Sequence, residues 1–305
     1  MKSVSQARSK ITRSLSRGLR LAGLLLTCGA LQVEAQHPAR SNQGTPVGQH
    51  QSKPKPGRPA SSLPSSPPAN MQSARTSAAA QSSDPQQLLL AGQTAVEQNR
   101  FDDAVRIYNR VIALSANKPQ TAAIAHFKIG NAYMVQRKFE NAVFGFQRAI
   151  ELNPNYAEAY NNLGEALGEL KQYPRALAVF SKAMALDPTL LKAKYNQAVS
   201  YDRMRNFRYS EFVFRSLIKS SPNYSLAYDG LAVTLSKAGR AKEAIAFHEK
   251  AIGLAPQDPS YFFNLAISYL MLGNTAKAFE QQEKLKAIDP LIADRLASVI
   301  IKRQM

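Results

Sequence analysis

The sequence predicts an all-α protein, an α-α superhelix in which helical hairpins stack into a solenoid. Pro154, Pro188, Pro222, Pro256 and Pro290 follow one another at intervals of 34 residues, a period typical of helix–turn–helix repeats. Between these prolines, apolar residues recur at spacings of three and four, which place them on one face of a helix. Small residues recur at two fixed positions of the period, one in each helix, where two helices can pack closely.

The clearest repeat, residues 157–190, shows how each element arises. Leu163 and Gly164 mark the packing face of the first helix, and Ala176 and Phe180 mark that of the second. Pro188 follows the second helix and has no amide hydrogen to continue it, so the chain turns there and starts the next repeat.

This segment resembles the tetratricopeptide repeat (TPR), whose fingerprint places an aromatic residue, Leu-Gly, Ala, an aromatic residue, Ala and Pro at these spacings. We count six copies, at residues 85–118, 123–156, 157–190, 191–224, 225–258 and 259–292. The small position of the first helix is held by Gly92, Gly130, Gly164, Ala198, Ala232 and Ala266. The small position of the second helix is held by Ala104, Ala142, Ala176, Ser210, Ala244 and Ala278. The resemblance implies a TPR solenoid.

The sequence departs from the repeat pattern in three places, and each departure leads to a prediction. Four extra residues, 119–122, predict a looser joint between the first two repeats. His248 and Gln282 stand where the other repeats have an aromatic residue, and predict weaker or wetter packing. Residues 293–305 predict a capping helix over the last hydrophobic face. Its apolar stripe includes Ile292, Leu296, Val299 and Ile300, and leaves Ile301 exposed.

The first 84 residues differ from the rest in composition. Residues 1–20 carry six basic residues and no acidic one, and a short apolar segment follows. Val33 and Ala35 fit the small-residue pattern of a cleavage site. We therefore expect residues 1–35 to be a signal peptide and the protein to be exported, to the periplasm if the source is bacterial. Residues 36–84, rich in Pro, Ser and Gln, predict a disordered linker.

Three alternatives for the leader stay open. Leu25-Leu26-Thr27-Cys28 is similar to a lipoprotein box, which would make the protein a lipid-anchored TPR lipoprotein through Cys28. Thr27 departs from that pattern, where Gly, Ala or Ser is usual. The leader would also serve as an uncleaved signal anchor, and its Arg- and Ser-rich composition suits a mitochondrial transit peptide.

The net charge limits which partners we expect, and the cysteine content limits which disulfides can form. The chain has a formal net charge of +18, and removal of residues 1–35 takes away six basic residues and one acidic one, leaving +13. We expect at most weak association of the basic linker with a membrane or cell wall. No stacking motif for nucleic acid is visible, so none is expected as a partner. Cys28 is the only cysteine, so a chain cleaved after Ala35 has no disulfide.

The sequence offers no catalytic constellation. Its four histidines are His37, His50, His126 and His248, and none belongs to a metal-binding, phosphate-binding or nucleophile motif. We expect a protein that is not an enzyme, with no metal and no cofactor.

The resemblance implies that the first helix of each repeat lines a concave, peptide-binding groove. Ten groove residues are candidates: Phe127, Asn131, Asn161, Asn162, Glu165, Lys192, Tyr195, Asn196, Phe263 and Asn264. Phe127, Tyr195 and Phe263 share one slot and either anchor a ligand or fill gaps between helices. Asn162, Asn196 and Asn264 share another, where an amide can hold a peptide backbone or be the ordinary family residue.

Three of these residues also match part of the family's carboxylate clamp. Asn131, Asn162 and Lys192 occupy three of its five slots, but Phe127 and Asn196 stand where cations would be required. We therefore do not expect a true clamp. The leading hypothesis is a scaffold or adaptor that binds protein or peptide partners and helps assemble a cell-envelope complex. The alternative is a structural envelope protein that associates with itself.

Overall fold

The computed structural model describes residues 82–304, and all of their regular structure is helical. The predicted signal peptide (1–35), the lipidation alternative at Cys28 and nearly all of the predicted linker (36–84) lie outside the described residues. The helices are α4 (Pro85–Glu97), α5 (Phe101–Leu114), α6 (Pro119–Val135), α7 (Phe139–Leu152), α8 (Ala157–Glu169), α9 (Tyr173–Leu186), α10 (Leu191–Arg203), α11 (Phe207–Ser220), α12 (Ser225–Lys237), α13 (Ala241–Leu254), α14 (Pro259–Met271), α15 (Thr275–Lys286) and α16 (Pro290–Gln304).

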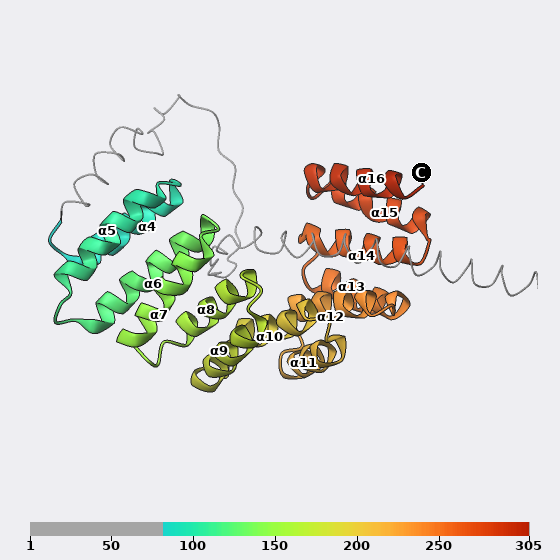
Figure 1. The fold of residues 1–305 in the computed structure, drawn as a ribbon. Coiled ribbons are helices and arrows are strands. Elements are labelled where there is room, and N and C mark those ends of the chain that lie inside the picture. Colours follow the sequence, from blue (N-terminus) through green and yellow to red (C-terminus); the bar gives the residue numbers. More distant parts are fainter. Residues whose placement is uncertain (1–81, 305) are drawn as a thin grey trace, which may run out of the picture.

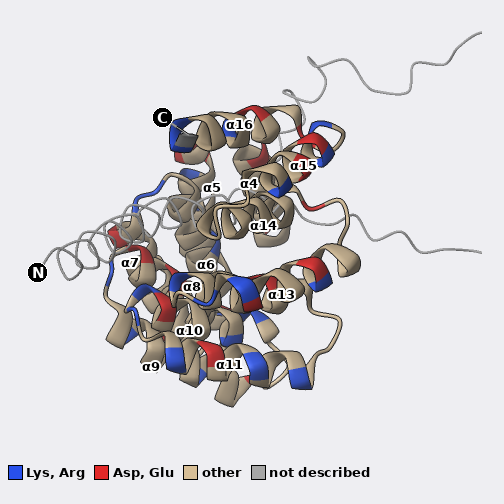
Figure 2. Ribbon diagram, turned by 90° about the vertical axis from the view of Figure 1, so that its right-hand side faces the viewer, with Lys and Arg blue, Asp and Glu red and all other residues tan. Residues whose placement is uncertain are grey.

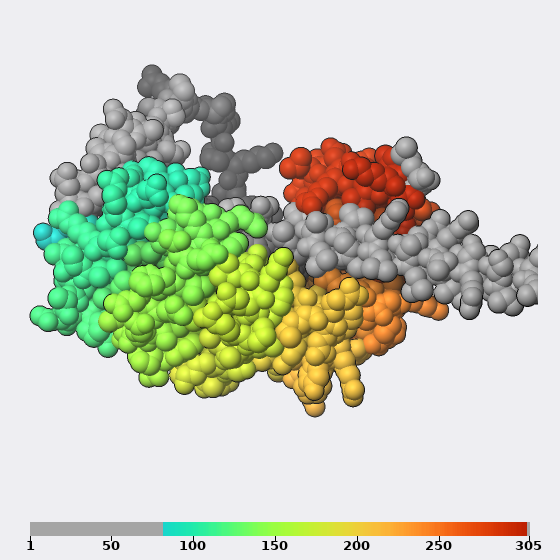
Figure 3. Space-filling view, viewed as in Figure 1, coloured from blue at the N-terminus to red at the C-terminus, as the bar shows by residue number. Residues whose placement is uncertain are grey.

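The helices pair into antiparallel hairpins that stack in chain order, which confirms the predicted solenoid. Each helix packs against its neighbours in sequence, and the first helices of consecutive repeats also contact one another. Figure 1 shows the resulting curved array, with the first helices on the inner side and α9 and α11 on the outer side. Figure 3 shows the same curve, with the middle repeats at the bottom and both ends of the array turned upward.

A residue with positive φ ends the first helix of every hairpin. The backbone φ is 58° at Asn99 and Arg137, 59° at Lys171 and 60° at Arg205. The equivalent turns of the last two repeats use Gly239 and Gly273. This left-handed conformation costs a residue with a side chain about 1–2 kcal/mol, so four of the six turns are strained relative to glycine.

The small residue of the first helix receives an aromatic ring from the second helix. The ring of Phe146 covers Gly130, where an added Cβ would lie 2.6 Å from the ring. The ring of Phe180 covers Gly164 and the ring of Tyr108 covers Gly92 in the same way. Close packing in the first three repeats therefore depends on an aromatic ring that occupies the space beside a glycine.

The aromatic residue of the fourth repeat also contacts the repeat that follows it. Here the ring of Phe214 reaches the next repeat and covers Gly230 of α12, where an added Cβ would lie 2.5 Å from the ring. Phe214 is fully buried and packs with Tyr195, whose ring centre is 5.6 Å away. The aromatic residue of the fourth repeat thus joins two repeats.

Three expectations from the departures need correction. The four extra residues do not loosen the first joint, because they form the first turn of α6, which begins at Pro119. The capping helix begins at Pro290, three residues before the predicted start, and buries Ala293 as well as Leu296 and Ile300. His248 and Gln282 are buried rather than open to solvent. Ile301 is exposed, as predicted.

Candidate peptide-binding groove

A hydrogen-bonded network of amides crosses the inner side of three repeats. Asn162 of α8 donates from Nδ2 to Oδ1 of Asn131 on α6 over 2.8 Å. Asn161 donates to Oδ1 of Asn162 over 3.0 Å, and Asn196 of α10 donates to Oδ1 of Asn161 over 3.1 Å. Asn161 lies buried beneath the others, which are half-buried. Sequence slots therefore placed these amides on one surface, and the structure links them.

The carboxylate of Glu165 holds the centre of this network. Its Oε1 atom accepts from Nδ2 of Asn161 over 2.8 Å and from Nδ2 of Asn196 over 2.7 Å. The same oxygen lies 2.9 Å from Nζ of Lys192. Lys192 is thus paired with an acid rather than left as a lone cation.

At each end of the network, one polar atom remains available to hydrogen-bond with a ligand. Among residues 82–304, Nδ2 of Asn131 has no hydrogen-bond acceptor and Oδ1 of Asn196 has no donor. An extended peptide backbone presents both kinds of group, so a fixed donor and a fixed acceptor suit it. Because the internal bonds hold the amides in place, a ligand would meet groups that are already ordered.

The three aromatic candidates lie within the packing between helices. Phe127, Tyr195 and Phe263 are between 4% and 9% exposed. The ring of Phe127 lies 4.9 Å from that of Tyr156, and Tyr195 packs between Phe214 and Tyr224. The structure therefore displays the gap-filling role of this slot, and a role as ligand anchors stays a prediction.

Burial also keeps the phenol of Tyr224 protonated. Burial, and then the charge of Glu165, raises the pKa of Tyr224 to about 12. Tyr224 therefore remains neutral throughout the physiological range and adds no charge to the groove.

A second polar cluster, buried in the fifth and sixth repeats, was missed by sequence reasoning. His248 of α13 lies with Nδ1 2.7 Å from Oδ1 of Asp229 and with Nε2 3.1 Å from Oγ of Ser268. Ser268 in turn lies 2.8 Å from Ser236, and Asn264 donates to Asp229 over 2.9 Å. All five side chains are buried, so this arrangement has no access to substrate. It is instead the polar replacement for the aromatic ring that other repeats place at this position.

Asn264 therefore belongs to this buried cluster and not to the amide network. Its Nδ2 atom is used by Asp229, and its Oδ1 atom is buried without a hydrogen-bond partner. The shared slot with Asn162 and Asn196 did not predict this difference, because the neighbouring residue that Asn264 meets is an aspartate.

The described surface carries charges of both signs. Figure 2 shows Lys and Arg interspersed with Asp and Glu along the array in this view. Among the described residues, no group of three or more His, Cys, Asp and Glu side chains lies where it could hold a metal ion. No helix in this part of the chain is both long enough and apolar enough to cross a membrane.

Comparisons with known proteins support the fold. Family models described as tetratricopeptide or TPR repeats match residues 89–145 and 195–259, residues 130–171 and residues 157–190. Together they cover more than half of the chain. No curated protein matches the sequence.

Solved structures of TPR-type proteins are similar in fold at low sequence identity. PilW, described as a widely conserved type IV pilus biogenesis factor, has a TM-score of 0.60 and 21% identity, covering 71% of this chain and 98% of its own. A tetratricopeptide repeat protein from Parabacteroides merdae has a TM-score of 0.62 and 18% identity, covering 76% and 90%. A thermophilic TPR protein of Thermus thermophilus has a TM-score of 0.53 and 20% identity, covering 60% and 99%.

Proposed function

Because the chain belongs to the tetratricopeptide repeat family, we propose that it is a non-enzymatic scaffold that binds peptide or protein partners on its concave side. One observation carries the proposal: the amide network from Asn131 to Asn196 is ordered internally and still has a donor and an acceptor to offer. These groups match the backbone of an extended segment. The binding site would lie on α6, α8 and α10.

The proposed setting is assembly of a cell-envelope complex. Two observations support it: the leader-like composition of residues 1–35, and the similarity in fold to PilW, whose description names pilus biogenesis. Intact mass of the mature chain tests the export step. A mass that begins at Gln36 supports cleavage after Ala35, a lipid adduct on Cys28 supports a lipoprotein, and a mass that includes Met1 argues against both.

In-cell crosslinking followed by affinity measurement tests the groove. A photocrosslinker placed at Met134 or Glu169 would identify the partner, whose affinity is then measured with purified full-length variants. We expect Lys192→Glu and Asn196→Ala to weaken binding by about tenfold or more, as loss of a charge or amide at a binding hot spot does. Lys182→Glu on the exposed side of α9 is the matched charge control and should leave the affinity unchanged.

Two results would contradict groove binding. One is a partner that binds the Lys192→Glu and Asn196→Ala variants as tightly as the wild type, provided that circular dichroism shows both variants to be folded. The other is a crosslinking pattern that is the same from concave and outer positions. Tyr195→Ala and Phe263→Ala are poor tests, because both rings are buried and their loss would disturb the fold.

Self-association is the second candidate, and one observation favours it. Leu291 and Ile301 of α16 are 80% and 52% exposed at the end of the array, where apolar side chains can pair with a second copy. Light scattering of the full chain with Leu291→Ser and Ile301→Ser distinguishes the candidates. A dimer in the wild type that dissociates in the variant supports self-association, and a monomer in both excludes it.

A further inference from the structure

A cleft on the outer side of the first two repeats is separate from the amide network. It lies between α5 and α7, over α6, and has a volume of about 470 Å³. His126, Ile129 and Tyr133 of α6 form its floor, at spacings that share one helical face. Asn131, which takes part in the amide network, lies on the opposite face of α6. The size falls within the range of small-molecule and side-chain pockets.

Two of the residues that line the cleft differ in type from their equivalents in the other repeats. Gly145 lines the cleft, at a position held by Ile107, Val179, Val213, Phe247 and Gln281 in the other repeats. His126 also lines it, at a position held by Leu88, Tyr160, Lys194, Tyr228 and Phe262. A Cβ added to Gly145 would lie 2.9 Å from the backbone nitrogen of Gly130, so this glycine lets α7 pack closely against α6. His126 places an imidazole beside it in the lining of the cleft.

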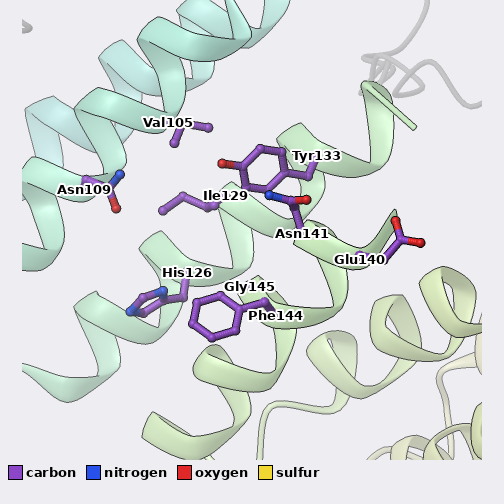
Figure 4. Close-up of a pocket in the computed structure, with 9 residues that line it drawn as sticks. All are labelled: Val105, Asn109, His126, Ile129, Tyr133, Glu140, Asn141, Phe144 and Gly145. Carbon is purple, nitrogen blue, oxygen red and sulfur yellow. The ribbon is translucent and has the colours of Figure 1, made fainter. Parts of the chain in front are cut away.

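The lining combines rings with polar groups. Figure 4 shows the side chains of His126 and Phe144 next to each other, with Ile129 and Tyr133 further along the cleft. Phe144 is 64% exposed, although a ring of this size is usually buried. A planar aromatic group entering the cleft would meet Phe144, Tyr133 and His126, and aromatic rings attract one another beyond the area that they bury.

The polar lining groups are free to bind. In the described part of the chain, the side chains of Asn109, His126 and Asn141 form no hydrogen bond with another residue. Asn109 comes from α5 and Asn141 from α7, so an amide stands on each wall. Such amides can bind the backbone on either side of an inserted side chain.

The charges around the cleft favour a ligand that is not acidic. Glu140 is the one carboxylate of the lining, and no Lys or Arg lines the cleft. Burial lowers the pKa of His126, and the charge of Arg148 lowers it further against the opposing effect of Glu151, so the imidazole is neutral near pH 7. A neutral or cationic ligand is therefore favoured over a carboxylate or a phosphate.

We propose that the cleft between α5 and α7 is a second binding site, which takes an aromatic side chain and its flanking backbone from a partner protein. The site is on the outer side of the array, so a partner in the concave groove would leave it open. The two sites can then be occupied at once by different segments.

N-acetyl-tryptophanamide is a direct probe of this site, because the chain has no tryptophan and the fluorescence of the probe can be excited alone. We expect saturable binding to the full-length protein in the millimolar range, about the affinity of a ligand of this size, with a shift of the His126 ring signals in NMR spectra. N-acetyl-leucinamide, with the same backbone and no ring, should bind more weakly.

Three variants locate the binding. Phe144→Ala should weaken it by about threefold to tenfold, the usual contribution of one ring pair. His126→Tyr, which installs the residue that Tyr160 and Tyr228 place at this position, should fill the cleft and abolish binding. Phe212→Ala is the matched control, since Phe212 occupies the slot of Phe144 two repeats later and is 70% exposed, and it should have no effect.

Each contrary result overturns the proposal. Absence of saturable binding would exclude the site, and unchanged binding by a folded His126→Tyr variant would place the probe elsewhere. Equal effects of Phe144→Ala and Phe212→Ala would indicate nonspecific contact with exposed rings. Equal affinity for the leucine and tryptophan amides would exclude an aromatic-specific cleft. None of these results depends on the concave groove, so the two proposals fail separately.

Discussion

The ring of Phe180 covers Gly164 so closely that a methyl group added to Gly164 would lie 2.7 Å from Cδ1 of the ring. Both residues belong to the third repeat, and Phe180 is fully buried, so the ring cannot move aside without disturbing its neighbours. The pair explains why a residue with poor helix propensity stands in the middle of α8.

Gly164→Ala should therefore destabilise the protein even though alanine favours helices. The clash costs about 1–3 kcal/mol and the gain in helix propensity offsets about 1 kcal/mol. We expect a net loss of up to about 2 kcal/mol in the free energy of unfolding, measured by urea denaturation. Gly168→Ala is the control in the same helix, because nothing lies within 4 Å of an added Cβ there. A loss of stability as large in Gly168→Ala as in Gly164→Ala would rule out the steric explanation.

His248→Phe should destabilise the protein although phenylalanine is the residue that Phe146, Phe180 and Phe214 place at this slot. The substitution removes the imidazole from between Asp229 and Ser268 and leaves buried polar atoms without that partner. A loss of about 1–3 kcal/mol is expected for such groups. The measurement is the urea midpoint of the variant against wild type. Increased stability would show that the buried polar cluster is not tightly coupled to the histidine.

Lys171→Gly should stabilise the protein. Lys171 is exposed and has a φ of 59°, which a glycine adopts without the steric cost of a side chain. We expect a gain of up to about 1 kcal/mol, read as a rise in melting temperature of about 2–4 °C per kcal/mol for an array of this size. Gly239→Ala, at the equivalent turn with a φ of 85°, should do the reverse. A decrease in melting temperature for Lys171→Gly would contradict this account of the turns.

The stability of the wild type should fall relative to His126→Tyr as the solution is acidified. Burial and the charge of Arg148 lower the pKa of His126 from its usual 6.5, so the unfolded chain binds the proton more readily than the folded one. The stability from the neutral ring is present above pH 6.5 and is lost as the pH falls through the lower, folded-state pKa. Urea denaturation of both proteins between about pH 8 and pH 5 measures the difference. A difference that is constant, or that grows in favour of the wild type in acid, would oppose the assigned shift.

The repeats could be predicted from the sequence because every hairpin has small residues at the same two positions, where its helices pack closely. Spacing alone gave the pairing of Gly164 with the helix that carries Ala176 and Phe180. The left-handed turns were not predicted, because Asn99, Arg137, Lys171 and Arg205 lack the glycine that would signal them. Their conformation is imposed by the two helices that they join.

The site was only partly predictable for a related reason. Slot assignments placed Asn162 and Asn196 at equivalent positions of stacked repeats, which lie side by side. Asn131, which entered through the resemblance to the clamp, is hydrogen-bonded to Asn162. The slot assignments did not show that Lys192 forms an ion pair with Glu165 or that Asn264 donates a hydrogen bond to Asp229. Those contacts depend on which residue the neighbouring repeat carries at the facing position. The outer cleft was not predicted, because neither Gly145 nor His126 signals a cavity by itself.

The contact between Phe214 and Gly230 links the fourth repeat to the fifth, so the two are not independent modules. Excision of residues 225–258 would remove Gly230 and bring Asn264, which holds the same position of the next repeat, against the ring of Phe214. An asparagine side chain cannot fit where even an added Cβ would lie 2.5 Å from the ring. Shortening the array at this point should therefore require the junction to repack.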